Sequence, residues 1–184
     1  MKKIIALLAF ALFIVGCAGT PQEQSANKMM KMQQEKNELL DKGVVAGIGI
    51  GESKNEQMAY DEADLNARTD VARSMESKVE ALIRNYQEEV GDELTQHKEA
   101  VKKNVVSDMQ NGVSVVKMDM EFQEESGKYK VYAIAAMNTE AFKKAFEAAL
   151  AAQKANVDRA RAMKGYADLD KAAAALDQYK ANQK

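Results

Sequence analysis

The chain has 184 residues, of which 46% are hydrophobic and 29% charged, with 26 basic and 28 acidic side chains and a net charge of −2. This length suits one domain of ordinary size with an appendage. The acidic balance argues against nucleic acid as the main partner, because nucleic-acid-binding proteins concentrate Lys and Arg on one face. The weakly basic residues after position 152 do not change that conclusion.

The first 16 residues have the pattern of a secretory signal. Lys2 and Lys3 precede an apolar run from Ile4 to Val15, and small residues follow it. The run is shorter than the roughly 20 residues that a membrane-spanning helix needs. We therefore predict that residues 1–16 are a removable signal peptide and not a stable anchor.

The next residue is Cys17, the only cysteine of the chain. Phe13 to Cys17 resembles a lipobox, the sequence in which a cysteine receives lipid, palmitate included, before the signal is cut. A lone thiol has no disulfide partner in an oxidising compartment, and a lipid thioether removes that difficulty. We predict a lipoprotein anchored through Cys17; an ordinary signal peptide with an incidental cysteine is the alternative. Ala18 favours the outer membrane and does not distinguish a periplasmic from a surface-facing body.

Residues 17–42 are polar and contain the chain's only proline, Pro21. We expect a tether that holds the domain off the lipid surface, with a helix forming near residues 27–40. Met29, Met30 and Met32 cluster in this segment. Thioether sulfur can bind Cu(I), but no second methionine motif accompanies them, and flexible apolar filler is the better interpretation.

The domain is expected to span residues 43–152 and to begin with a strand over Val44–Gly51. Gly47, Gly49 and Gly51 share one face of that strand, which would let a helix backbone approach closely. The Gly-x-Gly string also invites a dinucleotide-binding interpretation. The third glycine of that fingerprint would fall at Glu52, where a carboxylate would oppose the pyrophosphate, so the packing interpretation is preferred.

A single amphipathic helix is predicted from Ser53, its cap, to Val90, with Gly91 closing it. Its apolar stripe recurs every seven residues and comprises Met58, Leu65, Ala72, Val79 and Tyr86, with Met75 and Leu82 between them. Such a helix would be about 57 Å long, which exceeds a small domain. Part of it should therefore project beyond the sheet or pack on a partner, and self-association is expected.

Two features of the helical region contain residue types that can bind metal ions. The outer face of the long helix mixes acidic and basic residues, for which a salt-bridged solvated surface is favoured over a divalent cation. These residues are Asp61, Glu62, Asp64, Arg68, Asp70 and Arg73. His97 lies in a second helix predicted over Asp92–Met109. As the only histidine, it has no partner for catalytic zinc or for a nucleophilic triad. We predict no catalytic residue, no metal ligand and no cofactor.

The period then changes from helix to strand. Residues 116–122 alternate apolar and charged side chains, a turn covers residues 124–128, and residues 129–135 form the second arm of an antiparallel hairpin. A helix beginning near Asn138 presents Phe142, Phe146 and Leu150 to the sheet. We predict an α+β fold with a small, mostly antiparallel three-stranded sheet packed against the long helix, and a loosely docked Ala-rich helical tail over residues 153–184.

These features together suggest a family. The glycine-alternating strand, the helical segment Ala59–Arg73 and the hairpin strand through Lys130–Ala133 resemble the LPP-twenty-like outer-membrane lipoproteins. The N-terminal domain of flagellar assembly protein T is similar. The resemblance covers residues 43–150. It implies an envelope location and a compact α+β domain, and it supplies no catalytic residues.

Two classes of function are compatible with this sequence. The first is a non-enzymatic envelope lipoprotein that binds other proteins or a second copy of itself. The second is a lipoprotein that binds or senses a small molecule between sheet and helices. The chain contains no Trp and no converging polar cluster, and ligand sites usually combine aromatic walls with such clusters. The first class is therefore preferred, and an enzyme is a distant third.

Overall fold

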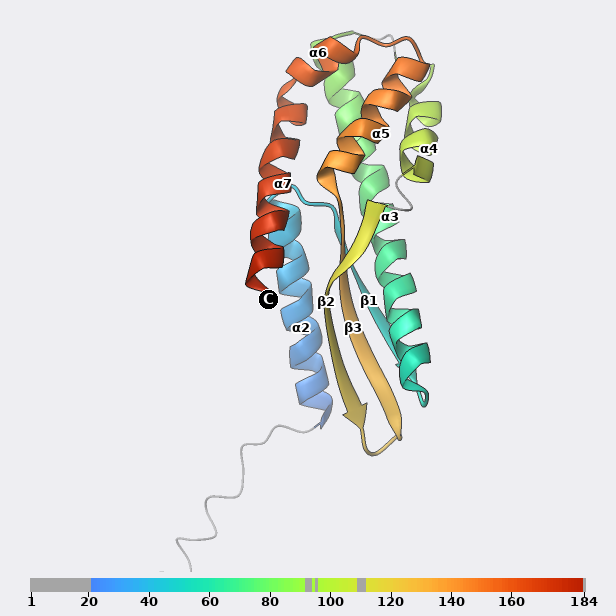
Figure 1. The fold of residues 1–184 in the computed structure, drawn as a ribbon, viewed down its shortest axis with the longest axis vertical. Coiled ribbons are helices and arrows are strands. Elements are labelled where there is room, and N and C mark those ends of the chain that lie inside the picture. Colours follow the sequence, from blue (N-terminus) through green and yellow to red (C-terminus); the bar gives the residue numbers. More distant parts are fainter. Residues whose placement is uncertain (1–20, 92–93, 95, 109–111, 184) are drawn as a thin grey trace, which may run out of the picture.

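The computed structural model describes residues 21–91, 94, 96–108 and 112–183. The predicted α+β class is confirmed: a three-stranded antiparallel sheet packs against helices (Figure 1). The elements in chain order are α2 (Pro21–Asp41), β1 (Ala46–Ser53), α3 (Glu56–Glu89), α4 (Lys98–Asp108), β2 (Val113–Gln123), β3 (Lys128–Met137), α5 (Thr139–Ala152), α6 (Val157–Ala162) and α7 (Lys164–Asn182).

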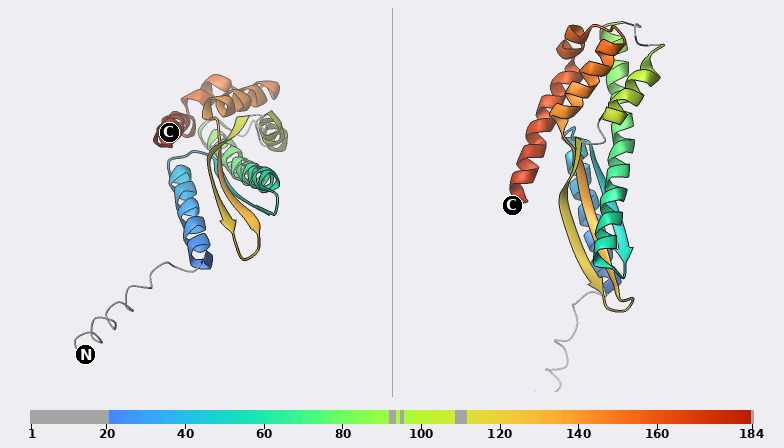
Figure 2. Two further views of the ribbon diagram at one scale, coloured as in Figure 1. Left: turned by 60° about the horizontal axis from the view of Figure 1, so that its bottom comes forward. Right: turned by 45° about the vertical axis from the view of Figure 1, so that its right-hand side comes forward.

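The sheet has the strand order β1-β3-β2. The predicted hairpin is present, with Phe122 opposite Tyr129, and β1 pairs with the other side of β3, with Ile50 opposite Tyr132. A bulge interrupts β2 between Val115 and Lys117. The sheet occupies one end of an elongated molecule, and α4, α5 and α6 gather at the other end (Figures 1 and 2).

Three glycines of β1 bring the backbone of α3 directly onto the sheet. A Cβ atom on Gly49 would overlap the carbonyl oxygen of Ala63 and the amide nitrogen of Ala67, and Gly47 and Gly51 meet the same helix in the same way. Only a residue without Cβ leaves room for this contact. The prediction that the glycines allow close helix approach is confirmed, and α3 fills the space that a pyrophosphate would need.

The buried side of α3 differs from the predicted stripe. In the first half of the helix the buried residues recur every four positions and are Ala59, Ala63, Ala67 and Val71. Met58 and Leu65 are 62% and 65% exposed. The seven-residue stripe was therefore wrong here, because a helix that touches the strand backbone has no depth for Met or Leu. The stripe holds in the second half, where the buried residues include Met75, Val79, Leu82 and Tyr86.

The start of α3 also differs slightly from the prediction. The N-cap is Asn55, whose side-chain oxygen accepts a hydrogen bond from the Met58 amide at 3.0 Å. Ser53, the predicted cap, is the last residue of β1, and its hydroxyl accepts from the Asn55 amide at 3.1 Å. The turn between strand and helix is thus held by two successive side-chain-to-backbone bonds.

The second half of α3 extends past the sheet, and the same chain covers it. Buried side chains of α4 and α5, among them Val101, Phe142 and Phe146, belong to one apolar core with the α3 residues Leu82 and Tyr86. The predicted helix over residues 92–109 is shorter in the structure, as α4 shows. The geometric reason for expecting a partner on α3 is thereby removed, whereas a partner elsewhere on the protein stays a prediction.

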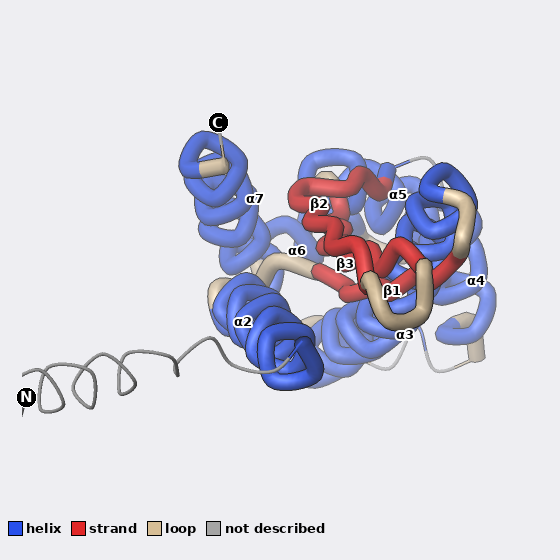
Figure 3. Tube along the Cα trace, turned by 90° about the horizontal axis from the view of Figure 1, so that it is seen from below, coloured by secondary structure: helices blue, strands red, loops and turns tan. Residues whose placement is uncertain are grey.

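Helix α2 covers the opposite face of the sheet (Figure 3). It begins at Pro21, a residue favoured in the first helical turn because its missing N–H has no partner there. Met32 and Leu39 are buried against Tyr132 and Ile134 of β3. The helix expected near residues 27–40 is confirmed. The expected tether was wrong for these residues, because a strand that is apolar on both faces needs a second covering layer.

The C-terminal segment is packed, in contrast to the loosely docked tail that we expected. Its helix α7 buries Leu169 in the core shared with α3 and α5, and buries Ala172 and Leu176 in the core shared with α2. The hydroxyl of Tyr179 donates to Glu35 of α2 at 2.9 Å. Helix α7 therefore joins the two covering layers of the sheet.

We predict that Gly49→Ala lowers the free energy of unfolding by at least about 1–3 kcal/mol, the usual cost of overpacking, because its Cβ meets backbone atoms that no rotamer change can move. Leu65→Ala, on the exposed side of α3, should stay within about 0.5 kcal/mol of the wild type. Denaturant unfolding of both variants measures this. A Gly49→Ala variant as stable as the wild type would contradict the close contact between α3 and β1. A strongly destabilised Leu65→Ala variant would restore the seven-residue stripe.

Candidate functional site

The outer edge of β1 is protected by side chains of α3. Three hydrogen bonds saturate alternate backbone groups of this strand: Ile48 N–H to Asp70 (3.0 Å), Asn66 to the Ile50 carbonyl (2.8 Å) and Glu52 N–H to Glu62 (3.0 Å). Glu62 belongs to the carboxylate group that we assigned to a solvated face. It is exposed as predicted, and its hydrogen bond to Glu52 also helps to close this edge of the sheet to another strand.

The opposite edge, strand β2, carries no comparable protection. Among the described residues, no side chain bonds to the backbone of β2 between Lys117 and Phe122. The alternation over residues 116–122 predicts a half-buried strand, but its apolar residues Met118, Met120 and Phe122 are 36%, 37% and 54% exposed. Helix α3 packs on β1 and β3 and does not cover these side chains of β2. The strand therefore presents an open backbone edge flanked by apolar side chains, which we call the β2 edge.

Charged residues on the other face of β2 hold helix α2 in place. Lys117 pairs with Glu35 at 2.6 Å, and Asp119 pairs with Lys28 at 3.0 Å. Glu121 lies 3.6 Å from the same lysine. Burial alone would lower the pKa of Lys28, but the hydrogen bond and charge of Asp119 outweigh it and the pKa is raised. These pairs keep the two layers in register along the strand.

A polar cluster lies between α2 and the sheet near the start of the helix. The hydroxyls of Ser25 and Tyr132 are 2.6 Å apart, Lys130 donates to Ser25 at 2.9 Å, and Tyr132 donates to Glu121 at 3.1 Å. A serine beside a lysine amine occurs in some hydrolases. Here Ser25 is only 9% exposed and its hydroxyl is shared with Tyr132, so the cluster serves to dock α2.

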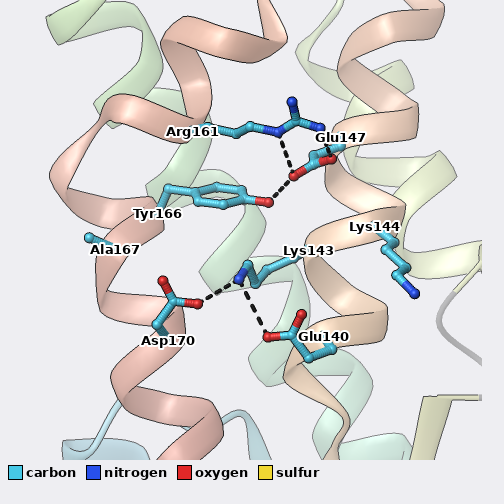
Figure 4. Close-up of a pocket in the computed structure, with 8 residues that line it drawn as sticks. All are labelled: Glu140, Lys143, Lys144, Glu147, Arg161, Tyr166, Ala167 and Asp170. Atoms are coloured by element: carbon cyan, nitrogen blue, oxygen red, sulfur yellow. Dashed lines mark hydrogen bonds and ion pairs between the residues drawn. The ribbon is translucent and has the colours of Figure 1, made fainter.

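A hollow of about 420 Å³ lies where α5, α6 and α7 meet (Figure 4). Lys143 bridges Asp170 at 2.5 Å and Glu140 at 3.4 Å. Glu147 accepts from Arg161 at 2.6 Å and from the hydroxyl of Tyr166. The lining residues are Glu140, Lys143, Lys144, Glu147, Arg161, Tyr166, Ala167 and Asp170.

Most ionisable groups of this hollow bind one another. The hydrogen bond from Arg161 lowers the pKa of Glu147 to about 2. Burial, reinforced by the contact with Glu147, raises the pKa of Tyr166. Lys143 and Arg161 are paired with Glu140, Asp170 and Glu147, while Lys144 points away from these groups (Figure 4), so a charged ligand gains little net attraction. We call the contacts of Glu147 with Arg161 and Tyr166, together with the Lys143–Asp170 pair, the staple. They fix α7 against α5.

The residues singled out from the sequence do not converge on a site. Cys17 lies outside the described residues, and His97 is exposed. Met32 is buried and Met30 is 69% exposed, so the methionines of α2 do not present a shared set of sulfur ligands. Within the described part of the chain, no three His, Cys, Asp or Glu side chains are arranged to hold a metal ion.

Sequence reasoning did not find the polar cluster or the staple. Ser25 and Tyr132 are 107 positions apart, and Glu147 and Tyr166 belong to different helices. One signal was available: Tyr132 carries a hydroxyl inside an otherwise apolar strand, and a buried hydroxyl needs a partner.

Comparison with models of protein families and with curated proteins finds no match for this chain. The resemblance to LPP-twenty-like lipoproteins therefore stays a prediction that rests on residues 43–150. Over the described residues, every helix is too short or too polar to cross a bilayer.

The staple makes a pH-dependent prediction. Because the pKa of Glu147 in the folded protein lies below its ordinary value of 4.5, its ionised form stabilises the fold above that pH, and the contribution is lost as the pH falls towards 2. Glu147→Gln should therefore lower the thermal midpoint at pH 7, and its difference from the wild type should shrink below pH 4.5. Glu80→Gln, at an exposed position of α3, is the control. A difference that is independent of pH would contradict this.

Proposed function

We propose that this protein is a lipid-anchored, non-enzymatic envelope protein that binds a partner protein through the β2 edge. The observation that carries the proposal is the contrast between the two edges of one sheet. At the β1 edge, Asp70, Asn66 and Glu62 bind three backbone groups, whereas on β2 the described side chains reach only the first residue, where Arg68 donates to the Val113 carbonyl at 2.7 Å, and leave Lys117 to Phe122 open. Proteins generally protect the edges of their sheets, because an open edge accepts a further strand.

The chemistry of the β2 edge suits an added strand from an extended segment of the partner. Backbone groups would supply affinity, and side chains would supply specificity. Met118, Met120 and Phe122 offer adaptable apolar contacts on one face. On the other face, Lys117 and Asp119 are already paired with Glu35 and Lys28 of α2, so the apolar face would supply the specificity. A second copy of the chain is the other candidate occupant.

The membrane attachment is proposed from the N-terminal sequence. The signal pattern, the lipobox-like segment ending at Cys17 and the following Ala18 support export and an outer-membrane lipid anchor. Several acyl chains hold a protein far more firmly than one, since each buried methylene contributes about 0.8 kcal/mol. The absence of a catalytic role is proposed from the single histidine and single cysteine of the sequence.

The small-molecule alternative would rest on the hollow between α5 and α7. That hollow is lined mainly by charged side chains that already pair with one another, and its one aromatic wall is Tyr166. Ligand pockets are predominantly apolar with a few convergent polar groups. Strand addition at the β2 edge is therefore preferred.

We expect Cys17 to be acylated. Cells supplied with a labelled fatty acid should label the wild-type protein and not Cys17→Ser, since the oxygen of serine does not replace the acylated sulfur. The substituted protein should accumulate with its signal uncut. Equal labelling of the two proteins would remove the anchor from the proposal.

The β2 edge can be tested by photocrosslinking in intact cells. A photoreactive residue in place of Met120 should give a discrete protein adduct, because that position lies on the open edge. The matched control is Glu52 of β1, which is also exposed but belongs to the protected edge. The adduct mass separates a second copy from a different protein. Equal crosslinking from both positions, or none from Met120, would contradict the assignment.

A further inference from the structure

The first turn of α2 lies level with the tip of the β2–β3 hairpin. Ser25 contacts Lys130 and Tyr132, and Lys130 is paired with Glu121. From Ser25 to Pro21 the helix covers about 6 Å at 1.5 Å per residue. Two further strand residues beyond Glu121 cover about the same length. The described chain therefore starts beside the hairpin turn, as Figure 1 shows.

The same end of the molecule includes the start of α3. In the sheet, Phe122 faces Tyr129, which in turn faces Ser53, and α3 begins at Glu56. We call this region, with the turn at residues 124–127, the hairpin end. The opposite or far end contains the last turn of α3 and the α5–α6 turn. The 34 residues of α3 place the two ends about 50 Å apart.

The chain between Cys17 and Pro21 is short. A fully extended chain covers at most about 3.3–3.6 Å per residue, so these four steps span no more than about 14 Å. A lipid on Cys17 sits at the bilayer surface, and the hairpin end must lie within that reach of it. The far end lies well beyond the same reach.

We propose that the domain stands on the membrane with its hairpin end in contact with the lipid headgroups, and with Phe122 as an apolar contact. This inference rests on the proposed lipid anchor at Cys17. The sequence alone suggested a domain that moves freely on a tether. In the proposed arrangement, the packed helix α2 holds the domain upright.

The distribution of exposed apolar side chains supports this orientation. Among the described residues, the large exposed ones all lie on α2, the first half of α3 or β2. The most exposed of them at the hairpin end are Met58 and Phe122, at 62% and 54%. None is on the helices of the far end. Apolar side chains of this kind gain free energy on entering the headgroup region.

Charge restricts the lipid surface that this end would meet. The turn carries Glu124 and Glu125, with Glu52 and Glu56 nearby. These acidic groups outnumber the nearby Lys54 and Lys128, and Lys128 is bound to Glu52 at 2.9 Å. An anionic surface would repel this end at short range. The contact therefore suits zwitterionic headgroups.

The orientation also bears on the β2 edge. An antiparallel pair of two β2 strands would turn the second copy upside down, with its hairpin end and anchor directed away from the membrane. Copies anchored in one membrane therefore cannot join in this way. For an upright domain, the β2 edge suits an extended segment of a different protein.

Three single-tryptophan variants test the orientation, because the natural chain has no Trp. Glu56→Trp and Glu89→Trp are a matched pair, since both replace exposed glutamates at the two ends of α3. Phe122→Trp reports the proposed contact. Each full-length protein is produced with its signal and placed in phosphatidylcholine vesicles that carry a nitroxide on a fraction of the headgroups. Intact mass establishes acylation, and thermal unfolding establishes folding. Gln57 and Glu88 are the replacement positions if a variant does not fold.

In acylated protein, the fluorescence of Glu56→Trp and Phe122→Trp should be quenched several-fold more than that of Glu89→Trp. Equal quenching at both ends of α3 would mean that the domain lies flat, and would overturn the proposal. Quenching of Glu56→Trp without quenching of Phe122→Trp would overturn the contact. A mass that lacks acyl chains would overturn the lipid anchor itself, which separates failure of the proposed function from failure of the orientation.

Discussion

The contact between the backbone of α3 and the glycine face of β1 determines where the other elements can lie. Because Gly47, Gly49 and Gly51 have no side chains, the helix sits directly on β1 and also covers β3. From there its polar side chains reach the outer edge of β1. In this position α3 does not reach the exposed apolar side chains of β2, Met118, Met120 and Phe122. One packing contact thus closes one edge of the sheet and leaves the other open.

The opposite face of the sheet depends on helix α2. Every residue of β3 from Val131 to Met137 is buried, so this strand requires a cover on both sides. Met32 and Leu39 provide the apolar part of that cover, and the pairs of Lys28 and Lys117 with β2 carboxylates fix its position. Since α2 starts only four residues after Cys17, packing of this helix also limits how far the domain can move from a lipid on that cysteine.

Several ion pairs of this protein join helices to other elements. The Glu147 staple connects α5, α6 and α7, and the Lys36–Asp70 pair at 2.6 Å connects α2 to α3. Partly buried pairs of this kind position elements more than they stabilise the fold. These charged groups bind one another, and the proposed contacts with a partner and a membrane are therefore assigned to the β2 edge and the hairpin end.

The sequence by itself determined the order of helices and strands, the hairpin, the helix start at Asn138 and the role of the glycines, because each depends on local periodicity or on the space that one residue type leaves. It also predicts the lipid site at Cys17, which lies outside the described residues. Only the tertiary structure decided that Ala59 and not Met58 faces the sheet, that α2 and α7 pack, and that Ser25 meets Tyr132. Those outcomes depend on which surfaces meet across long sequence separations, and the apolar run of β3 was the one local sign that a second layer was required.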